Sequence, residues 1–186
     1  MNVADGPEND VDVSGRSLLT QARNGEQALN DDPGDAAGDA ALAFIGHVRS
    51  PWHSRAECPK NVVAARETGQ AASLHVDEPF RPGLAGLAGF SHAIVLTWFD
   101  RAQRNLIVQK PRHALEAKGV FALRSPVRPN PIGLHVVSVR SVDLASGVVA
   151  IDAIDVLDGT PVIDIKPYFA SVDAVPEATR PTRDQA

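Results

Sequence analysis

Residues 134–165 read LHVVSVRSVDLASGVVAIDAIDVLDGTPVIDI, and this stretch decides the fold. Residues 134–142 alternate apolar and polar side chains with the period of two that is typical of a half-buried strand. Residues 148–154 and 161–165 are further apolar runs, and each follows a short turn that contains a glycine. Because short turns join neighbouring strands in opposite directions, the stretch predicts consecutive antiparallel strands.

The preceding part of the chain adds three more strands. Residues 42–48, 73–76 and 92–99 are rich in apolar and β-branched residues, and the last of them reads HAIVLTWF. Helix is scarce, because residues 83–89 (GLAGLAG) indicate a tight turn and residues 106–118 hold at most a short turn interrupted by proline. Six strands in about 130 residues predict an all-β protein, a single-sheeted antiparallel β-barrel of six to seven strands with short helical turns.

Charge divides the chain of 186 residues unevenly. Residues 1–41 hold nine acidic and two basic residues, a net charge of −7, whereas the rest holds 16 basic and 14 acidic residues, a net charge of +2. The N-terminal part has no aromatic residue and few large apolar ones, which is typical of disordered segments. We therefore expect a disordered acidic extension over residues 1–40, a barrel domain over residues 41–175 and a tail over residues 176–186.

Composition argues against several functional classes. No apolar run approaches the roughly 18 residues needed to cross a membrane. Cys58 is the only cysteine, which excludes an internal disulfide and a cysteine-based zinc site, and the six histidines show no pair at ligand spacing on a helix. No glycine fingerprint of a Rossmann nucleotide site follows a predicted strand. We expect a cytoplasmic protein that holds no metal.

The segment most suited to binding a ligand is residues 119–133, GVFALRSPVRPNPIG. Its three prolines restrict their own φ angles and the residues before them, so the segment is extended and stiff. Stiffness reduces the entropy lost when a ligand binds. Arg124 and Arg128 stand on this segment without a local acid, and their guanidinium groups suit a carboxylate or a phosphate. The alternative is a proline-rich connection with two surface arginines.

Two other segments carry candidate residues. Residues 155–168 contain Asp155 and Asp158 beside a tight turn, where a carboxylate can bind an amine or ribose hydroxyls; the alternative is a turn capped by Asp158. Residues 50–61 form a long loop with two prolines, which is typical of a site wall but equally of a plain surface loop. Cys58 in this loop is either an incidental small residue or a reactive thiol.

The motifs in these segments resemble the TsaA/YaeB-like family, whose characterised enzymes are called TrmO. Residues 119–130, GVFALRSPVRPN, follow the family signature without departure, and residues 158–161 (DGTP) and 164–168 (DIKPY) match further family motifs. The resemblance covers about residues 42–173. Because the chain stops soon after the predicted barrel, it is similar to the short members of the family, which lack a C-terminal extension.

The resemblance implies an activity and a set of partners. It implies a homodimeric barrel that binds S-adenosyl-L-methionine near the dimer interface and methylates N6 of threonylcarbamoyladenosine at position 37 of tRNA. By position, the implied cofactor contacts are Pro59, Lys60, Asn61, Asp100, Arg101, Arg124, Leu134, Asp155, Val156, Leu157 and Asp158. The chain departs from the commoner family pattern at Asp100-Arg101 and at Lys60-Asn61.

A methyl transfer to a delocalised nitrogen benefits from a nearby base. The candidates are Asp155, Asp158 and Asp164, and the sequence does not choose among them. Two other functions stay open: a barrel that binds S-adenosyl-L-methionine or RNA without catalysis, and a methyltransferase for a small molecule. A hydrolase that uses histidine and aspartate is a more distant alternative.

Overall fold

The computed structural model describes residues 22–29, 41–111 and 116–180. Over these residues the strands are β1 (Gln27–Ala28), β2 (Gly46–Arg49), β3 (Ala72–Val76), β4 (His92–Trp98), β5 (Leu106–Gln109), β6 (Lys118–Gly119), β7 (Ile132–Asp143), β8 (Val148–Ile151) and β9 (Pro161–Pro167). The helices are short: α2 (Val62–Glu67), α3 (Ala170–Asp173) and the 3₁₀ segments η1 (Glu78–Leu84), η2 (Leu87–Gly89) and η3 (Val120–Ala122).

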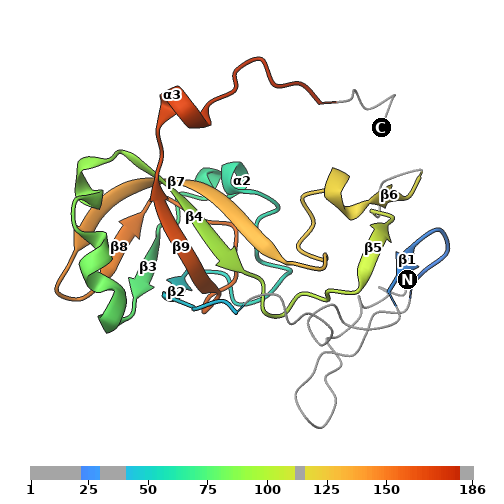
Figure 1. Ribbon diagram of the computed structural model, residues 1–186, viewed down its shortest axis with the longest axis horizontal. Coiled ribbons are helices and arrows are strands. Elements are labelled where there is room, and N and C mark those ends of the chain that lie inside the picture. Colours follow the sequence, from blue (N-terminus) through green and yellow to red (C-terminus); the bar gives the residue numbers. More distant parts are fainter. Residues whose placement is uncertain (1–21, 30–40, 112–115, 181–186) are drawn as a thin grey trace, which may run out of the picture.

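Six of these strands close into a barrel in the order β2-β3-β8-β7-β4-β9, with every pair antiparallel (Figure 1). This confirms the predicted all-β barrel. The long strand β7 pairs with β4 from Ile132 to Ser138, whereas β8 joins it only from Val139 onward. The first half of β7 therefore pairs with β4 on one side only. Its other side faces the segment that follows β8.

The period of two explains the core. In β4 the buried side chains are Ala93, Val95 and Thr97, which alternate with half-buried ones. The inward positions of the other strands supply the rest of the apolar core, which includes Val48, Leu74, Val137, Val149, Ile151 and Val162. Burial of each such side chain stabilises the fold by about 1.5–3 kcal/mol.

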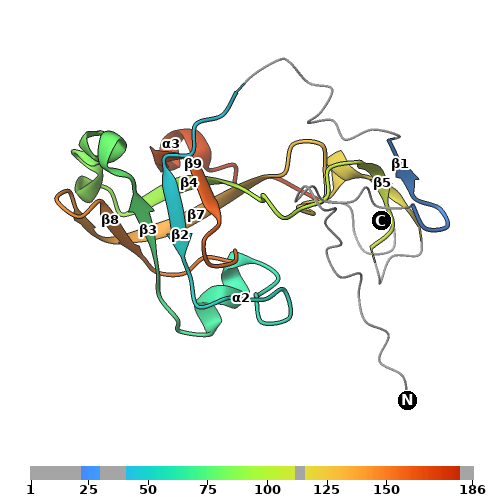
Figure 2. The ribbon, with the colours of Figure 1, turned by 90° about the horizontal axis from the view of Figure 1, so that it is seen from below.

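A second, small sheet lies beside the barrel, with the order β1-β5-β6 (Figures 1 and 2). The prediction of at most a short turn after residue 105 was wrong, because residues 106–109 form β5 between two partners. Residues 27–28 of the predicted extension form β1. Residues 1–21 and 30–40 lie outside the described part, where the prediction of disorder stays a prediction.

Two local elements differ from the predictions or were missed. Within residues 83–89, only residues 85–86 form a turn; residues 83–84 end η1 and residues 87–89 form η2. Helix α2 was not predicted; the carboxamide of Asn61 caps it by accepting a hydrogen bond of 2.9 Å from the Ala64 amide. Among the described residues, no helix is long and apolar enough to span a bilayer.

Candidate active site

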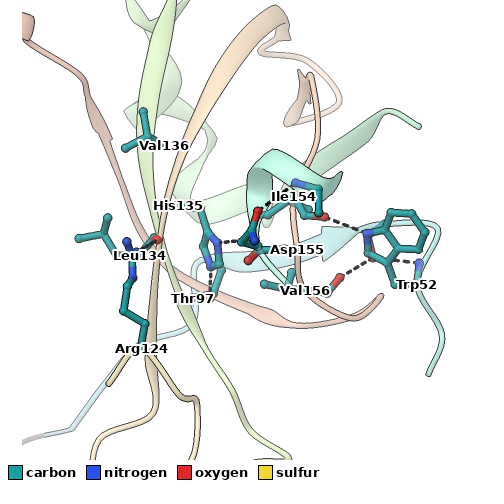
Figure 3. A network of polar contacts seen from close by, with 12 residues as sticks. Trp52, Thr97, Arg124, Leu134, His135, Val136, Ile154, Asp155 and Val156 are labelled. Atoms are coloured by element: carbon teal, nitrogen blue, oxygen red, sulfur yellow. Dashed lines mark hydrogen bonds and ion pairs between the residues drawn. The ribbon is translucent and has the colours of Figure 1, made fainter. Parts of the chain in front are cut away.

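Two segments are tied together at one end of the barrel, the loop of residues 50–61 and residues 154–160 (Figure 3). The indole Nε1 of Trp52 donates to the Ile154 carbonyl at 2.8 Å, and the Trp52 carbonyl accepts from the Asp158 amide at 2.7 Å. The Ser50 hydroxyl donates to the Val156 carbonyl at 2.7 Å. Because these groups are buried, their hydrogen bonds hold the backbone on both sides of Asp155 in place.

Asp155 meets a buried histidine at this end. His135 on β7 is 5% exposed, and its Nδ1 lies 2.9 Å from Asp155 Oδ1 (Figure 3). Its Nε2 lies 3.0 Å from the hydroxyl of Thr97 on β4, which is fully buried. The Phe99 ring packs edge-on against the imidazole with 6.2 Å between ring centroids. These contacts fix the imidazole plane, and through it one oxygen of Asp155.

Gly133 makes room for this cluster. It lies opposite Thr97 in the β4–β7 register. A Cβ at this position would lie 2.6 Å from His135 Nε2 and 2.7 Å from Phe99 Cζ, and it would also collide with the Thr97 hydroxyl. Glycine is therefore required here by space, at the end of the proline-rich stretch that the sequence singled out.

The three candidate bases are in different states. Asp158 accepts from the Ser50 amide at 3.1 Å through Oδ1 and pairs with Arg49 at 3.2 Å through Oδ2. Asp164 pairs with Lys166 at 2.5 Å. The Asp155 carboxylate is 20% exposed and is held by His135 through Oδ1, whereas its Oδ2 has no hydrogen-bond or ion-pair partner among the described residues. Of the three, Asp155 is the one with a carboxylate oxygen that makes no hydrogen bond or ion pair among the described residues.

The loop of residues 119–133 is braced by one of its own arginines. Arg128 donates to the carbonyls of Ser125 at 2.8 Å and Val120 at 2.9 Å, and also to that of Leu123. It therefore shapes the loop. Arg124 is exposed and reaches the edge of β7, where its Nη2 donates to the Leu134 carbonyl at 3.3 Å.

The structure brings part of the predicted cofactor set together. Arg124 contacts the carbonyl of Leu134 on β7, and the next residue of that strand, His135, contacts Asp155 from the opposite face (Figure 3). Asp158 is tied to the loop of residues 50–61 through Trp52. The Leu134 side chain is 51% exposed, on the outer face of β7.

The remaining predicted contacts have different surroundings. Asp100 and Arg101 are exposed, as are Lys60 and Asn61; Pro59 and Leu157 are half-buried. The Val156 side chain is buried in the apolar core, and its carbonyl is taken by Ser50. These residues stay predictions as cofactor contacts.

Cys58 is a poor nucleophile. Burial raises the pKa of its thiol to about 11, and the negative charge of Asp155 contributes in the same direction. The thiol therefore stays protonated at neutral pH. The effect of Asp155 also shows that this part of the loop lies near the carboxylate.

Sequence reasoning missed His135, Thr97 and Trp52 as parts of the site. The alternation of β7 places residue 135 on the same face as the core residue Val137, and a histidine on an inward face needs a polar partner. That signal was available, but the partners come from β4 and from beyond β8. Among the described residues, no group of three or more His, Cys, Asp or Glu side chains is arranged to hold a metal ion.

Comparisons with known proteins show which family the chain is similar to. Residues 47–174 match the family model described as tRNA-methyltransferase O N-terminal domain. The chain is 39% identical over 130 residues to the probable S-adenosyl-L-methionine-binding protein VirR of Rhizobium radiobacter, covering 70% of this chain and 71% of that protein. It is 34% identical over 143 residues to the tRNA (adenine(37)-N6)-methyltransferase of Escherichia coli, covering 73% of this chain and 60% of the enzyme.

A solved structure shares the fold. The crystal structure of TrmO from Pseudomonas aeruginosa superposes with a TM-score of 0.60 at 32% identity, covering 81% of this chain and 63% of that one. The chain thus spans somewhat less than two thirds of the TrmO structure and of the Escherichia coli enzyme.

Proposed function

This chain belongs to the family of tRNA-methyltransferase O N-terminal domains, and on that premise we propose that it is an S-adenosyl-L-methionine-dependent methyltransferase acting on tRNA. The acceptor is N6 of threonylcarbamoyladenosine at position 37. The name of the Escherichia coli relative, which acts on N6 of adenine 37, supports the position. A tRNA substrate also favours a cytoplasmic protein.

The observation that carries the proposal is the Asp155 carboxylate, which His135 holds through one oxygen and whose other oxygen has no partner among the described residues; His135 directly follows Leu134, whose carbonyl accepts from Arg124. The donor set fits the cofactor. The exposed guanidinium of Arg124 suits the carboxylate of its methionine part, and the exposed side chain of Leu134 offers an apolar surface. In this proposal the exposed residues Lys60, Asn61 and Asp100 add polar groups for the rest of the molecule.

Bound S-adenosyl-L-methionine supplies a methyl group on a positively charged sulfur. The chain's own task is to align the acceptor nitrogen with this group and to remove the N6 proton. The N6 lone pair is delocalised into the ring and the carbamoyl group, so the nitrogen is a poor nucleophile until its proton moves. Asp155 Oδ2 accepts that proton in our proposal.

The test uses the full chain with labelled S-adenosyl-L-methionine and tRNA that carries threonylcarbamoyladenosine without the N6 methyl group. We expect label on nucleotide 37 with the native chain, and a loss of about 10²-fold or more with Asp155→Asn, which keeps the size but cannot take the proton. Asp164→Asn is the matched control and should keep the activity. Cofactor binding without transfer by the native chain would support a non-catalytic module instead.

The second part of the proposal is a homodimer through the outer face of β4 and β7. Here Leu96 lies opposite Leu134 and Trp98 opposite Ile132, and Leu134 and Ile132 are 51% and 43% exposed. An apolar patch of this kind is typical of a subunit interface. We expect a dimer by light scattering at micromolar concentration, and a monomer after Leu134→Arg; Leu144→Arg, at an exposed leucine in the β7–β8 turn, is the control.

A further inference from the structure

We propose that His135 is a positioning residue that holds the Asp155 carboxylate so that Oδ2 faces the methyl acceptor. The inference deepens the proposed function and rests on it. His135 itself touches no reacting atom, because it is 5% exposed and lies behind the carboxylate, inside the barrel. Its effect on the reaction therefore passes through Asp155.

The protonation of His135 follows from its two partners. A carboxylate oxygen only accepts, so Nδ1 carries the hydrogen in the 2.9 Å contact with Asp155. The Thr97 hydroxyl is buried, and it contacts His135 Nε2 at 3.0 Å. With a neutral imidazole the hydroxyl donates to Nε2 and both groups are satisfied. With a charged imidazole, Nε2 donates and the hydroxyl hydrogen has no acceptor among the described residues.

The two hydrogen bonds that link Thr97, His135 and Asp155 are thus donated in the same direction. Thr97 donates to His135, which donates to Asp155, and the last acceptor keeps its second oxygen open. The imidazole cannot rotate without losing both hydrogen bonds, and Phe99 packs against its edge. A carboxylate held in this way stays close to the one orientation in which it can react.

The competing explanation is a histidine that only satisfies a buried polar site. The two explanations differ in which nitrogen matters. For the fold alone, the contact with Thr97 and the contact with Asp155 count equally. For positioning, the Nδ1 contact is essential and the Nε2 contact is secondary.

Two amide variants separate the nitrogens. In His135→Asn the side-chain nitrogen is bonded to Cγ, as Nδ1 is, so it can still donate to Asp155 but does not reach Thr97. In His135→Gln the amide lies one bond further out, near the place of Nε2, so it can reach Thr97 but leaves Asp155 free to turn. Both variants are neutral, polar and smaller than or similar in size to histidine, so they are matched.

We expect His135→Gln to lower kcat for tRNA methylation about 10²-fold, the scale of a misplaced reactive group, while the Kd for S-adenosyl-L-methionine by calorimetry stays within a few-fold of the native value. His135→Asn should keep kcat within about tenfold. Equal kcat values for the two variants would overturn the inference, as would a native kcat in His135→Gln. Thermal unfolding of both variants checks that they are folded.

A spectroscopic measurement tests the same point without either His135 variant. In the native chain, ¹⁵N–¹H NMR should show His135 as the neutral tautomer with hydrogen on Nδ1, and Asp155→Asn should shift this resonance. A His135 signal with hydrogen on Nε2 alone contradicts the proposed direction of the contacts. If the native chain transfers no methyl group, the proposed function fails; if it does and His135→Gln is equally active, only the role of His135 fails.

Discussion

The replacement Gly133→Ala tests the packing on which the candidate site depends. The added Cβ would lie 2.6 Å from His135 Nε2 and 2.7 Å from Phe99 Cζ, and would also collide with Thr97 Oγ1. The neighbours are buried or half-buried and cannot swing into solvent. Overpacking of this kind costs about 1–3 kcal/mol. Separating Thr97 from His135 leaves buried polar groups unpaired, which costs about 1–3 kcal/mol more.

The free energy of unfolding should therefore fall by roughly 3 kcal/mol, from those two contributions. For a domain of this size the midpoint of thermal unfolding should fall by about 10 °C. The assay is circular dichroism on heating, with Gly89→Ala as the control, because a Cβ at Gly89 meets nothing within 4 Å. A midpoint within about 2 °C of the native value for Gly133→Ala, the scatter expected of an ordinary surface change, would refute the packing argument.

Three other outcomes follow from single contacts. Arg128→Ala removes the donors that brace residues 119–133, so trypsin should cleave after the exposed Arg124 much faster than in the native chain; Arg128→Lys should not restore protection, because one ammonium cannot reproduce the guanidinium fork. The hydrogen bond from Arg23 holds the pKa of Glu26 at about 2, so the stabilisation from this carboxylate is complete above pH 4.5 and is lost as the pH falls towards 2. Hydrogen-exchange protection of the Lys110 amide, which donates to Glu26, should disappear over that range, and Glu26→Gln should abolish the pH dependence. Iodoacetamide at pH 8 should modify Cys58 about a hundredfold more slowly in the folded chain than in urea, because the pKa of about 11 leaves little thiolate; equal rates would contradict the burial of this thiol.

The barrel was predictable because each of its main strands carries a recognisable pattern of apolar residues within its own segment. The alternation in residues 134–142 and the apolar run of residues 92–99 fix which side chains face inward, and β7 and β4 follow both within two residues at each end. The small sheet was not predictable in this way. Its strands β1 and β6 have two residues each and exist through pairing with β5, so no pattern within either segment announces them.

The binding loop shows what proline content can and cannot tell. Three prolines predicted a stiff, extended segment, and the segment is indeed without a long helix or strand. The same reasoning predicted that Arg124 and Arg128 both bind a ligand. They differ because Arg128 turns back on the Val120, Leu123 and Ser125 carbonyls, whereas Arg124 points outward to β7. Which way an arginine turns depends on where carbonyls are left without partners, and that is a property of the folded loop.

The choice among the three aspartates depends on competition for carboxylate oxygens. Asp158 and Asp164 lie next to turn and strand neighbours that carry a cation, Arg49 and Lys166, and both are paired. Asp155 pairs with no lysine or arginine among the described residues and meets the His135 imidazole instead. The sequence does not reveal which aspartates are paired with a cation, because all three fall within ten residues of one another.

The adjacency of β8, β7 and β4 in the sheet explains why this cluster forms. Thr97 lies on β4, His135 on β7 and Asp155 just beyond β8, so three neighbouring strands each bring one member to the same end of the barrel. The register sets the detail: Gly133 stands opposite Thr97, and the missing side chain opens the space into which the imidazole extends. A shift of β7 against β4 by one residue would turn His135 to the outer face and leave Asp155 without its partner. The orientation of the proposed base is therefore determined by the same hydrophobic alternation that closes the barrel.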